Sequence, residues 1–530
     1  MKKDFFKLLT LTALVAGVFS SCTKELNRYP TNGSTSQTVL STAAGYKQEL
    51  AKVYSAFAVT SNSDPGTTDV PGGDAGASDF LRLFWNTQEI TTDEGKCAWL
   101  DNAGVQDLDQ DTWVASNAVL LGLYDRCEYQ ILLANVFISQ SSDANITSHG
   151  ISGADATEIR YYRAEARFLR AYQYWVLMDA FGNVTYIDEN SPIGAFFPKQ
   201  IGRAALFSYI ESELKAIDPL LKAPHKNEYA RADQAAAWAL LARVYLNAQV
   251  YTGTARWADA MTYSKKVIDA GYPLMTKYQN LFLADNNLNN SELIFPIAYD
   301  ANYTKTYGGT TFLVNSSINN SWSETPAYYG VKGGGWSGNR ASQKVTAYFP
   351  DTTGKTDVRA IFRIREKTLD TLGSFSSGIG VVKFKNTTSA GVAKSDASGT
   401  FVSTDFPLFR SAEMYLTYAE ASVRSGNSGG LALQYYNTVR TRAYNNTTAG
   451  NVTSIALTDI LSERGREFYW EATRRTDLIR FGLFTGDSYI WPFKGGTVSG
   501  GAIADYRSLF PIPQADVIAN PNLKQNTGYN

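Results

Sequence analysis

The sequence predicts a mainly α-helical protein in which helix pairs form a right-handed scaffold and an irregular, loop-rich lobe with short strands interrupts them. Segments with apolar residues at helical spacing recur through most of the chain. Between about residues 275 and 405 this period disappears, and short apolar runs alternate with Gly-rich turns. The chain has 530 residues, 44% hydrophobic and 19% charged, which is the composition of a globular protein.

Charge and composition exclude several classes of function. With 49 Lys and Arg against 50 Asp and Glu, the chain has no overall field that would attract nucleic acid or an anionic membrane. The 10 Trp, 32 Tyr and 27 Phe favour an exported protein with aromatic surfaces, but they do not separate sugar binding from large aromatic cores. The two histidines, His149 and His225, do not build a multi-histidine metal site.

The chain begins with a predicted lipoprotein signal peptide over residues 1–21. Three lysines precede the apolar run from Leu8 to Phe19, and Ser20-Ser21-Cys22 follows, which resembles a bacterial lipobox. Cys22 would then carry acyl chains that anchor the protein; the alternative is a plain secretory signal with an accidental cysteine. Residues 22–37 are polar and predict a tether.

The region 38–274 predicts helix pairs of the tetratricopeptide-repeat type. Four residues have the spacing of the first helix of such a repeat, in which a large residue, a small residue and a Tyr pack against a partner helix: Trp238, Leu241, Ala242 and Tyr245. Ala260 and Val267 follow on the predicted second helix. Similar but imperfect pairs recur at 160–181 and 411–444, so we expect a helical scaffold rather than a regular solenoid.

The region 275–405 predicts an irregular lobe. It contains apolar runs at Leu293–Ile297 and Val381–Phe384, a Gly308-Gly309 turn and a run of three glycines at 333–335. Long loops in a compact protein usually carry function. Cys97 and Cys127 either pair or remain as small buried hydrophobes.

The region 406–530 carries the motifs that identify a family. The blocks are Tyr506–Pro513 with Asn520–Tyr529, Phe409–Leu416 with Tyr418–Ala421, Glu463–Phe468 with Asp477–Gly482, and, near the amino terminus, Thr92-Asp93-Glu94 followed by Trp99. Together they resemble the SusD/RagB family of outer-membrane lipoproteins of Bacteroidetes. The resemblance implies a glycan-binding subunit on the cell exterior, which covers a SusC-like, TonB-dependent transporter and passes oligosaccharide to it, without catalysis or a cofactor.

A sugar ring offers an apolar C–H face to aromatic rings and hydroxyls to polar side chains. We therefore select aromatic and polar residues on predicted loops as candidate ligand residues. In starch-binding relatives the Trp of the amino-terminal loop belongs to an aromatic arc and a nearby Asn binds sugar hydroxyls, which implies these roles for Trp99 and Asn102. The alternative for Trp99 is packing under its own loop. Asp74 and Arg82 are candidates for charge-assisted hydrogen bonds, with solvated loop charges as the alternative.

Aromatic residues of the irregular lobe form a second candidate group. Trp322 and Trp336 are the leading stacking candidates, with Tyr303 and Tyr307 beside them, and loop packing is the alternative for each. The alternatives for Arg340 are a contact with a sugar and an ion pair with Asp351, of which we expect the ion pair. Tyr328 and Tyr329 are further aromatic residues of the lobe. The charges between Glu463 and Arg480 have helical spacing, which favours salt bridges over ligand contacts.

Two other classes of function stay open at this point. A surface glycoside hydrolase needs two converging carboxylates, for which Asp93 with Glu94 and Asp107 with Asp109 are candidates, but neighbouring side chains on an extended loop point to opposite faces. No other catalytic motif is present. An assembly protein that binds peptides on its repeats is the third class. The sequence does not identify the glycan, and it shows no calcium-loop motif.

Overall fold

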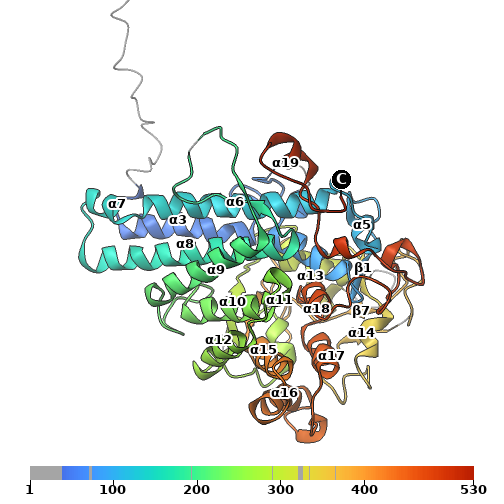
Figure 1. Ribbon diagram of the computed structural model, residues 1–530. Coiled ribbons are helices and arrows are strands. Elements are labelled where there is room, and N and C mark those ends of the chain that lie inside the picture. The colour runs from blue at the N-terminus through green and yellow to red at the C-terminus, as the bar shows by residue number, and fades with distance from the viewer. Residues whose placement is uncertain are drawn as a thin grey trace, which may run out of the picture.

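The computed structural model describes residues 39–70, 75–192, 194–288, 290–319, 326–333, 335–364 and 366–529. The signal segment, Cys22 and the tether therefore lie outside the described residues. The predicted mainly α-helical fold with helix pairs and an irregular lobe is confirmed (Figure 1). Within these ranges, every helix is too short or too polar to cross a membrane. The chain division at 274 and 405 stays a prediction.

The amino-terminal helices pack one after another. α6 packs on α8, α8 on α9, and α10 on α12, so the helices form the successive layers seen from top to bottom of Figure 1. Their bounds are α3 (Ala43–Ala58), α4 (Phe80–Trp85), α5 (Val105–Gln110), α6 (Ala118–Gln140), α7 (Asp143–Ser148), α8 (Gly153–Ala180), α9 (Arg203–Ile217), α10 (Gln234–Leu246), α11 (Ala248–Thr252) and α12 (Trp257–Asp269).

The clearest predicted repeat forms the α10–α12 pair. Asp233 caps α10, because its carboxylate accepts hydrogen bonds from the backbone N–H groups at the start of the helix. Leu241, Ala242 and Tyr245 are fully buried, and Trp238 is half-buried. The spacing therefore predicted the helix pair, but it did not single out one packed face, because nearly every residue of α10 is buried.

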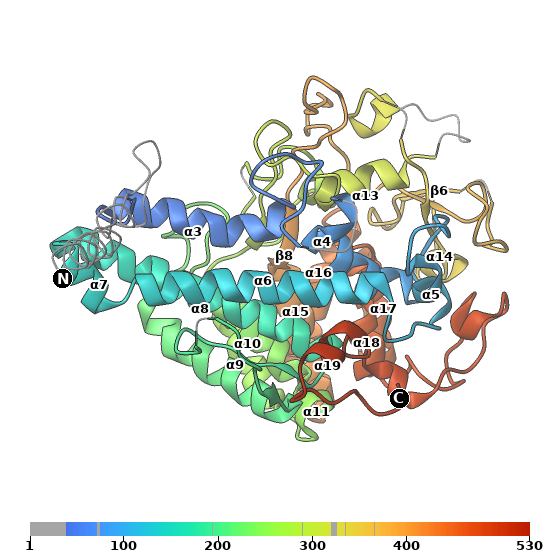
Figure 2. The ribbon, with the colours of Figure 1, turned by 90° about the horizontal axis from the view of Figure 1, so that it is seen from above.

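Short antiparallel strand pairs join segments that lie apart in the chain, and two of these pairs connect the lobe to the scaffold. β1 (Gly95–Cys97) pairs with β5 (Asn339–Ala341), which brings the amino-terminal loop beside the lobe. The other pairs are β2 (Val184–Thr185) with β3 (Gln200–Ile201), β4 (Leu293–Ile297) with β8 (Phe406–Arg410), and β6 (Phe362–Arg363) with β7 (Gly380–Val381). In Figure 2, α13 and β6 of the lobe lie across α6 from α9.

The lobe is less irregular than predicted, because it contains α13 (Gly309–Ser317) and α14 (Gln343–Ala347). The expected Gly308-Gly309 turn is the start of α13. Gly309 has a φ of 55°, and a Cβ there would lie 2.6 Å from the Tyr299 ring. The backbone N–H of Gly309 donates to Asp79, which also caps α4, so one carboxylate holds the two helices together.

The carboxy-terminal helices are α15 (Ser411–Arg424), α16 (Gly430–Ala443), α17 (Leu457–Phe468), α18 (Arg474–Arg480) and α19 (Gln514–Ala519). The helical spacing of the charges from Glu463 to Arg480 suggests one continuous helix, which is wrong, since the helix breaks between α17 and α18. Trp470 and Ala472 both have positive φ there, and the Trp470 carbonyl accepts a hydrogen bond from the indole of Trp85. Tertiary packing therefore outweighs local helical preference at this break.

The charges of α17 form buried salt bridges, as predicted. Glu463 and Glu467 are fully buried and accept hydrogen bonds from Arg359 at 2.6 and 2.9 Å. Arg410 and Arg442 also pair with Glu467. Burial alone would raise the pKa of Glu463, but the arginines around it, Arg359 foremost, lower it to about 2. The cluster joins segments that are far apart in the sequence.

Candidate functional site

The loop that carries Trp99 is fixed at both ends. The Ala98 N–H donates to the carbonyl of Gly338 at 2.9 Å, next to the β1–β5 pair. The Cys97 N–H donates to Asp109 at 2.9 Å, and Cys97 itself is free and buried, as is Cys127. Burial raises the pKa of the Cys97 thiol to about 12, so it stays a neutral, packed side chain.

The Trp99 indole is half-buried and held on one side. Its ring lies 5.9 Å from that of Phe312, and the Arg82 guanidinium lies 5.4 Å from its centroid. Gly338, with a φ of 115°, is so close that a Cβ there would lie 2.5 Å from the indole. Trp99 thus packs against the fold and also lines a hollow of about 550 Å³.

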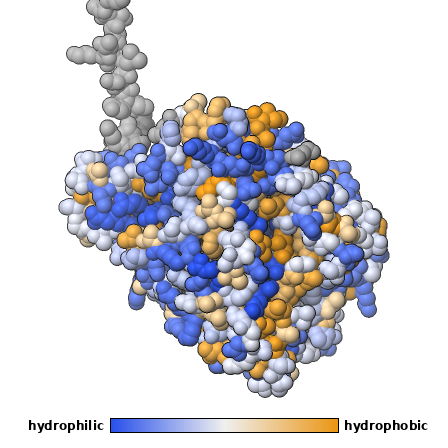
Figure 3. All heavy atoms as spheres, in the orientation of Figure 1, coloured by the Kyte–Doolittle hydropathy of each residue, from blue (hydrophilic) through white to orange (hydrophobic). Residues whose placement is uncertain are grey.

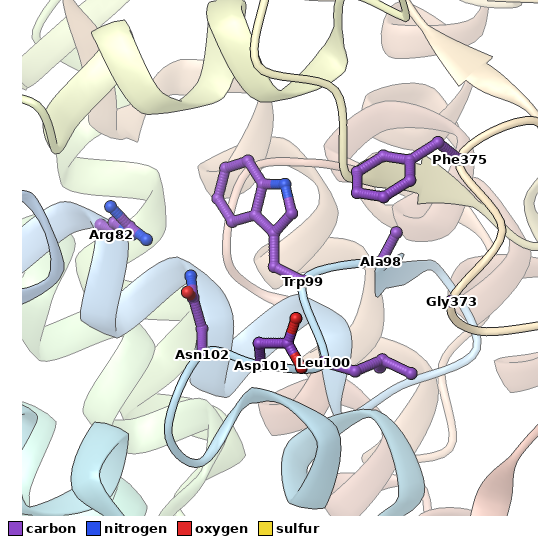
Figure 4. Close-up of a pocket in the computed structure, with 8 residues that line it drawn as sticks. All are labelled: Arg82, Ala98, Trp99, Leu100, Asp101, Asn102, Gly373 and Phe375. Atoms are coloured by element: carbon purple, nitrogen blue, oxygen red, sulfur yellow. The ribbon is translucent and has the colours of Figure 1, made fainter.

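Polar and aromatic groups surround this hollow. In Figure 4 the indole stands between Arg82 and Asn102 on one side and Phe375 on the other. Arg82 comes from α4 and is buried, whereas Asp101 and Asn102 are exposed. The remaining lining residues are Ala98, Leu100 and Gly373. The arrangement offers a flat ring, an aromatic wall and several hydrogen-bonding groups in one place.

The structure brings the lobe aromatics Tyr307 and Trp336 near this hollow. Their ring centroids lie 6.3 Å apart with planes tilted by 46°, and Tyr307 is 41% exposed. A Cβ on Gly76 would lie 2.7 Å from the Cβ of Tyr307 and 3.1 Å from Arg82. Trp336 stands two residues before Gly338, the residue under Trp99. These side chains therefore occupy one region.

None of the other predicted aromatic and polar site residues is a lining residue of the Trp99 hollow in the described part of the structure. Tyr303 is 87% exposed, four residues before Tyr307, and nothing packs its ring into the fold. Tyr329 is buried, and Tyr328 is exposed beside it, at 5.5 Å between ring centroids. Asp74 and Trp322 lie outside the described residues.

Arg340 does not pair with Asp351, contrary to expectation. Its guanidinium is buried and donates to the carbonyls of Ser377 and Thr371, each at 3.0 Å, and to that of Leu372. Arg340 thereby holds the loop that places Phe375 opposite Trp99. The sequence analysis missed Phe375, although an aromatic residue in a stretch rich in Gly and Ser is the same signal that selected the lobe aromatics.

The rival catalytic carboxylates do not reach this hollow. Asp93 is 0% and Glu94 is 1% exposed. Asp93 accepts two hydrogen bonds from Arg474, both at 2.8 Å, and although burial alone would raise its pKa, Arg474 lowers it. Burial and the nearby Glu89 raise the pKa of Glu94 well above its usual value.

The second candidate pair of carboxylates, Asp107 and Asp109, is also engaged within the fold. Asp109 is fully buried, and Asp107 accepts a hydrogen bond from Asn117 at 3.0 Å. Over the described ranges, no three or more His, Cys, Asp or Glu side chains are grouped so as to hold a metal ion.

Comparisons with known proteins agree across the chain. A model of the SusD family matches residues 367–529, and a model described as starch-binding associating with outer membrane matches residues 76–246. The starch-binding protein SusD of Bacteroides thetaiotaomicron is 34% identical over 100% of both chains. A SusD-like protein of Bacteroides ovatus is 29% identical over 62% of this chain and 60% of its own.

Solved structures share the fold at lower identity. A SusD-like carbohydrate binding protein of Bacteroides fragilis has a TM-score of 0.71 at 20% identity, with 92% of this chain and 100% of that chain covered. Surface glycan-binding protein A of Bacteroides thetaiotaomicron, in complex with laminarihexaose, has a TM-score of 0.67 at 20% identity, with 91% and 98% covered.

Proposed function

This chain belongs to the SusD family, and we propose that it binds a starch-like glycan at the cell exterior through the Trp99 hollow. The observation that carries the proposal is the half-buried indole in a hollow of about 550 Å³, with Arg82, Asp101 and Asn102 beside it. The indole suits the apolar face of a sugar ring and the polar groups suit its hydroxyls. Starch is proposed because the full-length relative at 34% identity is a starch-binding protein.

The tilt of the lobe aromatics supports a curved ligand. A flat, ribbon-like glycan needs stacking rings that share one plane, whereas a helical α-glucan turns its sugar faces from one residue to the next. The 46° between the Tyr307 and Trp336 ring planes suits the second geometry. We propose that Trp99, Trp336 and Tyr307 act as stacking surfaces, with Tyr303, Trp322 and Asp74 as further candidates.

Affinity electrophoresis through amylopectin, laminarin or mannan tests this proposal. We expect amylopectin to retard the wild type, and Trp99→Ala to bind roughly 10- to 100-fold more weakly, since a buried aromatic side chain contributes about 1.5–3 kcal/mol. Phe197→Ala is the matched control, because this ring is 59% exposed and belongs to neither the hollow nor the lobe. Unchanged retardation of a folded Trp99→Ala protein would refute the site, and retardation by laminarin alone would refute the ligand.

We propose that the glycan is bound and not cleaved. The burial of Asp93, Glu94 and Asp109 supports this, since a hydrolase needs two carboxyl groups at the bound glycosidic bond. Incubation of the protein with the glycans that it retains, followed by a reducing-end assay, tests the point. Robust formation of new reducing ends would contradict it.

We also propose lipid attachment at Cys22 in the outer membrane, facing the exterior, with a SusC-like TonB-dependent transporter as partner. Family membership supports both. Figure 3 displays hydrophobic side chains over α19, where Ile518 is 77% exposed. Ile518 and Val114 line a separate hollow of about 490 Å³. Such an apolar surface suits a protein partner. Co-purification with a large outer-membrane barrel, and loss of acyl labelling in Cys22→Ala, test these proposals.

A further inference from the structure

A second, smaller hollow adjoins the Trp99 hollow and shares Arg82, Asp101 and Asn102 with it. It lies between α4, the first turns of α6 and the loop that follows Trp99, and it measures about 190 Å³. We call it the Asn86 pocket, after the polar residue that lines it. Its other walls are mostly aliphatic, from Leu83, Val105 and Val119.

Asn86 is an unusual lining residue because its amide oxygen has no partner. The side chain is 6% exposed, and its Oδ1 accepts no hydrogen bond. A buried polar atom without a partner costs about 1–3 kcal/mol, so such groups are uncommon in folded proteins. Asn86 also begins a π-helical turn, Asn86–Ile90, directly after α4. Such turns occur frequently at functional sites.

A glycine in α6 leaves space for the pocket. Gly122 lies in the interior of this long helix, where glycine costs about 0.5–1 kcal/mol relative to alanine. A Cβ at this position would lie 3.1 Å from the Cδ2 of Leu83, and both residues line the pocket. The helix therefore has no side chain where one would narrow the space.

Size and enclosure limit what the pocket can hold. Its 190 Å³ is smaller than the roughly 300–1,000 Å³ of sites for drug-sized ligands, which suits one sugar ring and not a chain. Side chains of α4 and α6 and the loop after Trp99 line it on several sides. A polysaccharide on Trp99 reaches such a narrow space only with a ring that ends a chain.

We propose that the Asn86 pocket takes one terminal sugar ring of the glycan held at Trp99, and that the side-chain amide of Asn86, which lines the pocket, forms a hydrogen bond with a hydroxyl of that ring. The aliphatic walls contact the C–H face of the ring. The terminal ring comes either from the end of the main chain or from a one-ring branch. This inference rests on the proposed glycan binding at Trp99, but its test separates the two.

Calorimetry with three glucans of equal ring number tests the inference: a cyclic one without a terminal ring, a linear one, and a linear one with a single glucosyl branch. Asn86→Leu should weaken binding of the linear or the branched glucan about 3- to 10-fold, as expected for loss of one hydrogen bond, and leave the cyclic glucan unaffected. The more affected ligand identifies the source of the ring.

A second variant tests the pocket without removing the amide. Ala118→Leu, from the first turn of α6, fills the pocket and should reduce binding of the same glucan at least as much. Ala154→Leu is the matched control, since Ala154 is exposed in the first turn of α8. Because Oδ1 has no partner, Asn86→Leu should not lower the melting temperature, as it would if the amide were structural.

The inference would be overturned if Asn86→Leu and Ala118→Leu weakened binding of the cyclic glucan as much as binding of the linear and branched glucans. It would also be overturned if neither variant changed the binding of any of the three glucans. If Trp99→Ala still abolishes binding of all three, the proposed function stands without the pocket. If Trp99→Ala changes nothing, the proposed function fails as well. The two proposals therefore fail in distinguishable ways.

Discussion

The buried carboxyl group of Asp109, beside the Trp99 loop, is expected to lower the stability of the folded protein at neutral pH, and a substitution tests this. The carboxyl is fully buried, its Oδ1 accepts the Cys97 N–H at 2.9 Å, and its Oδ2 has no partner. Burial raises its pKa to about 7 from the usual 3.8. Asp109→Asn keeps the shape and the acceptor oxygen but removes the ionisation, so the protein no longer has to hold a buried charge.

The size and sign of the effect follow from this difference of about three pKa units. Each unit corresponds to about 1.36 kcal/mol, so the carboxylate lowers the free energy of unfolding by about 4 kcal/mol once it is ionised in the folded protein. Below pH 4 both states hold the proton and nothing is lost. Between pH 4 and 7 only the unfolded chain releases it, so stability falls as the pH rises and is lowest above pH 7.

Thermal melting of the wild type and Asp109→Asn at pH 4 and pH 8 measures this difference. With an unfolding entropy of about 1 kcal/mol/K for a chain of this length, the advantage of the variant should grow from near zero at pH 4 to about 4 °C at pH 8. Asp155→Asn, at an exposed position on α8, should show no such growth. An advantage of Asp109→Asn that is the same at both pH values, or a loss at pH 8, would refute the reasoning.

Two further substitutions probe the buried charges and the site. Glu467→Gln leaves buried arginine charge uncompensated and should lower the free energy of unfolding by about 3–5 kcal/mol, whereas Glu228→Gln, in an exposed pair, should cost less than about 1 kcal/mol in the same melts. Gly338→Ala places a Cβ 2.5 Å from the indole of Trp99 and should weaken amylopectin binding as much as Trp99→Ala does. Gly391→Ala, also at positive φ but in open space, separates backbone strain from displacement of the ring, and equal binding by both alanine variants would contradict the role of Gly338.

Helical periodicity predicted the scaffold well, because packing of a repeated face decides it. The spacing from Trp238 to Tyr245 predicted the α10–α12 pair, although α10 is buried on nearly every side and not on one face. The same method failed between α17 and α18, where Trp470 and Ala472 adopt positive φ without a glycine or proline to signal a break. Hydrogen bonds with Trp85 and Glu89, almost four hundred residues earlier, hold that segment, and such partners are not visible in the local sequence.

The candidate site was predictable only in part. Trp99 and Asn102 were selected from one loop and Arg82 from a separate stretch upstream, and the structure places all three around one hollow. Phe375 reaches that hollow through the hydrogen bonds of Arg340 to its loop, which depend on tertiary structure. Asn86 begins a short polar run after Phe84-Trp85 and carries no motif, and its interest comes from an amide oxygen without a partner in the folded protein.

The contacts that hold the Trp99 loop in place should reduce the entropy cost of binding a polysaccharide in the Trp99 hollow. Ordering a loop or a flexible side chain on binding costs about 0.5–1.5 kcal/mol per side chain, which is comparable to the gain from stacking one sugar ring. Here the β1–β5 pair, Asp109 and Gly338 fix the loop before any ligand arrives. Most of the stacking energy is therefore available for binding. A repeating glycan also offers the hollow many equivalent rings, so each contact can stay weak while the glycan as a whole is retained.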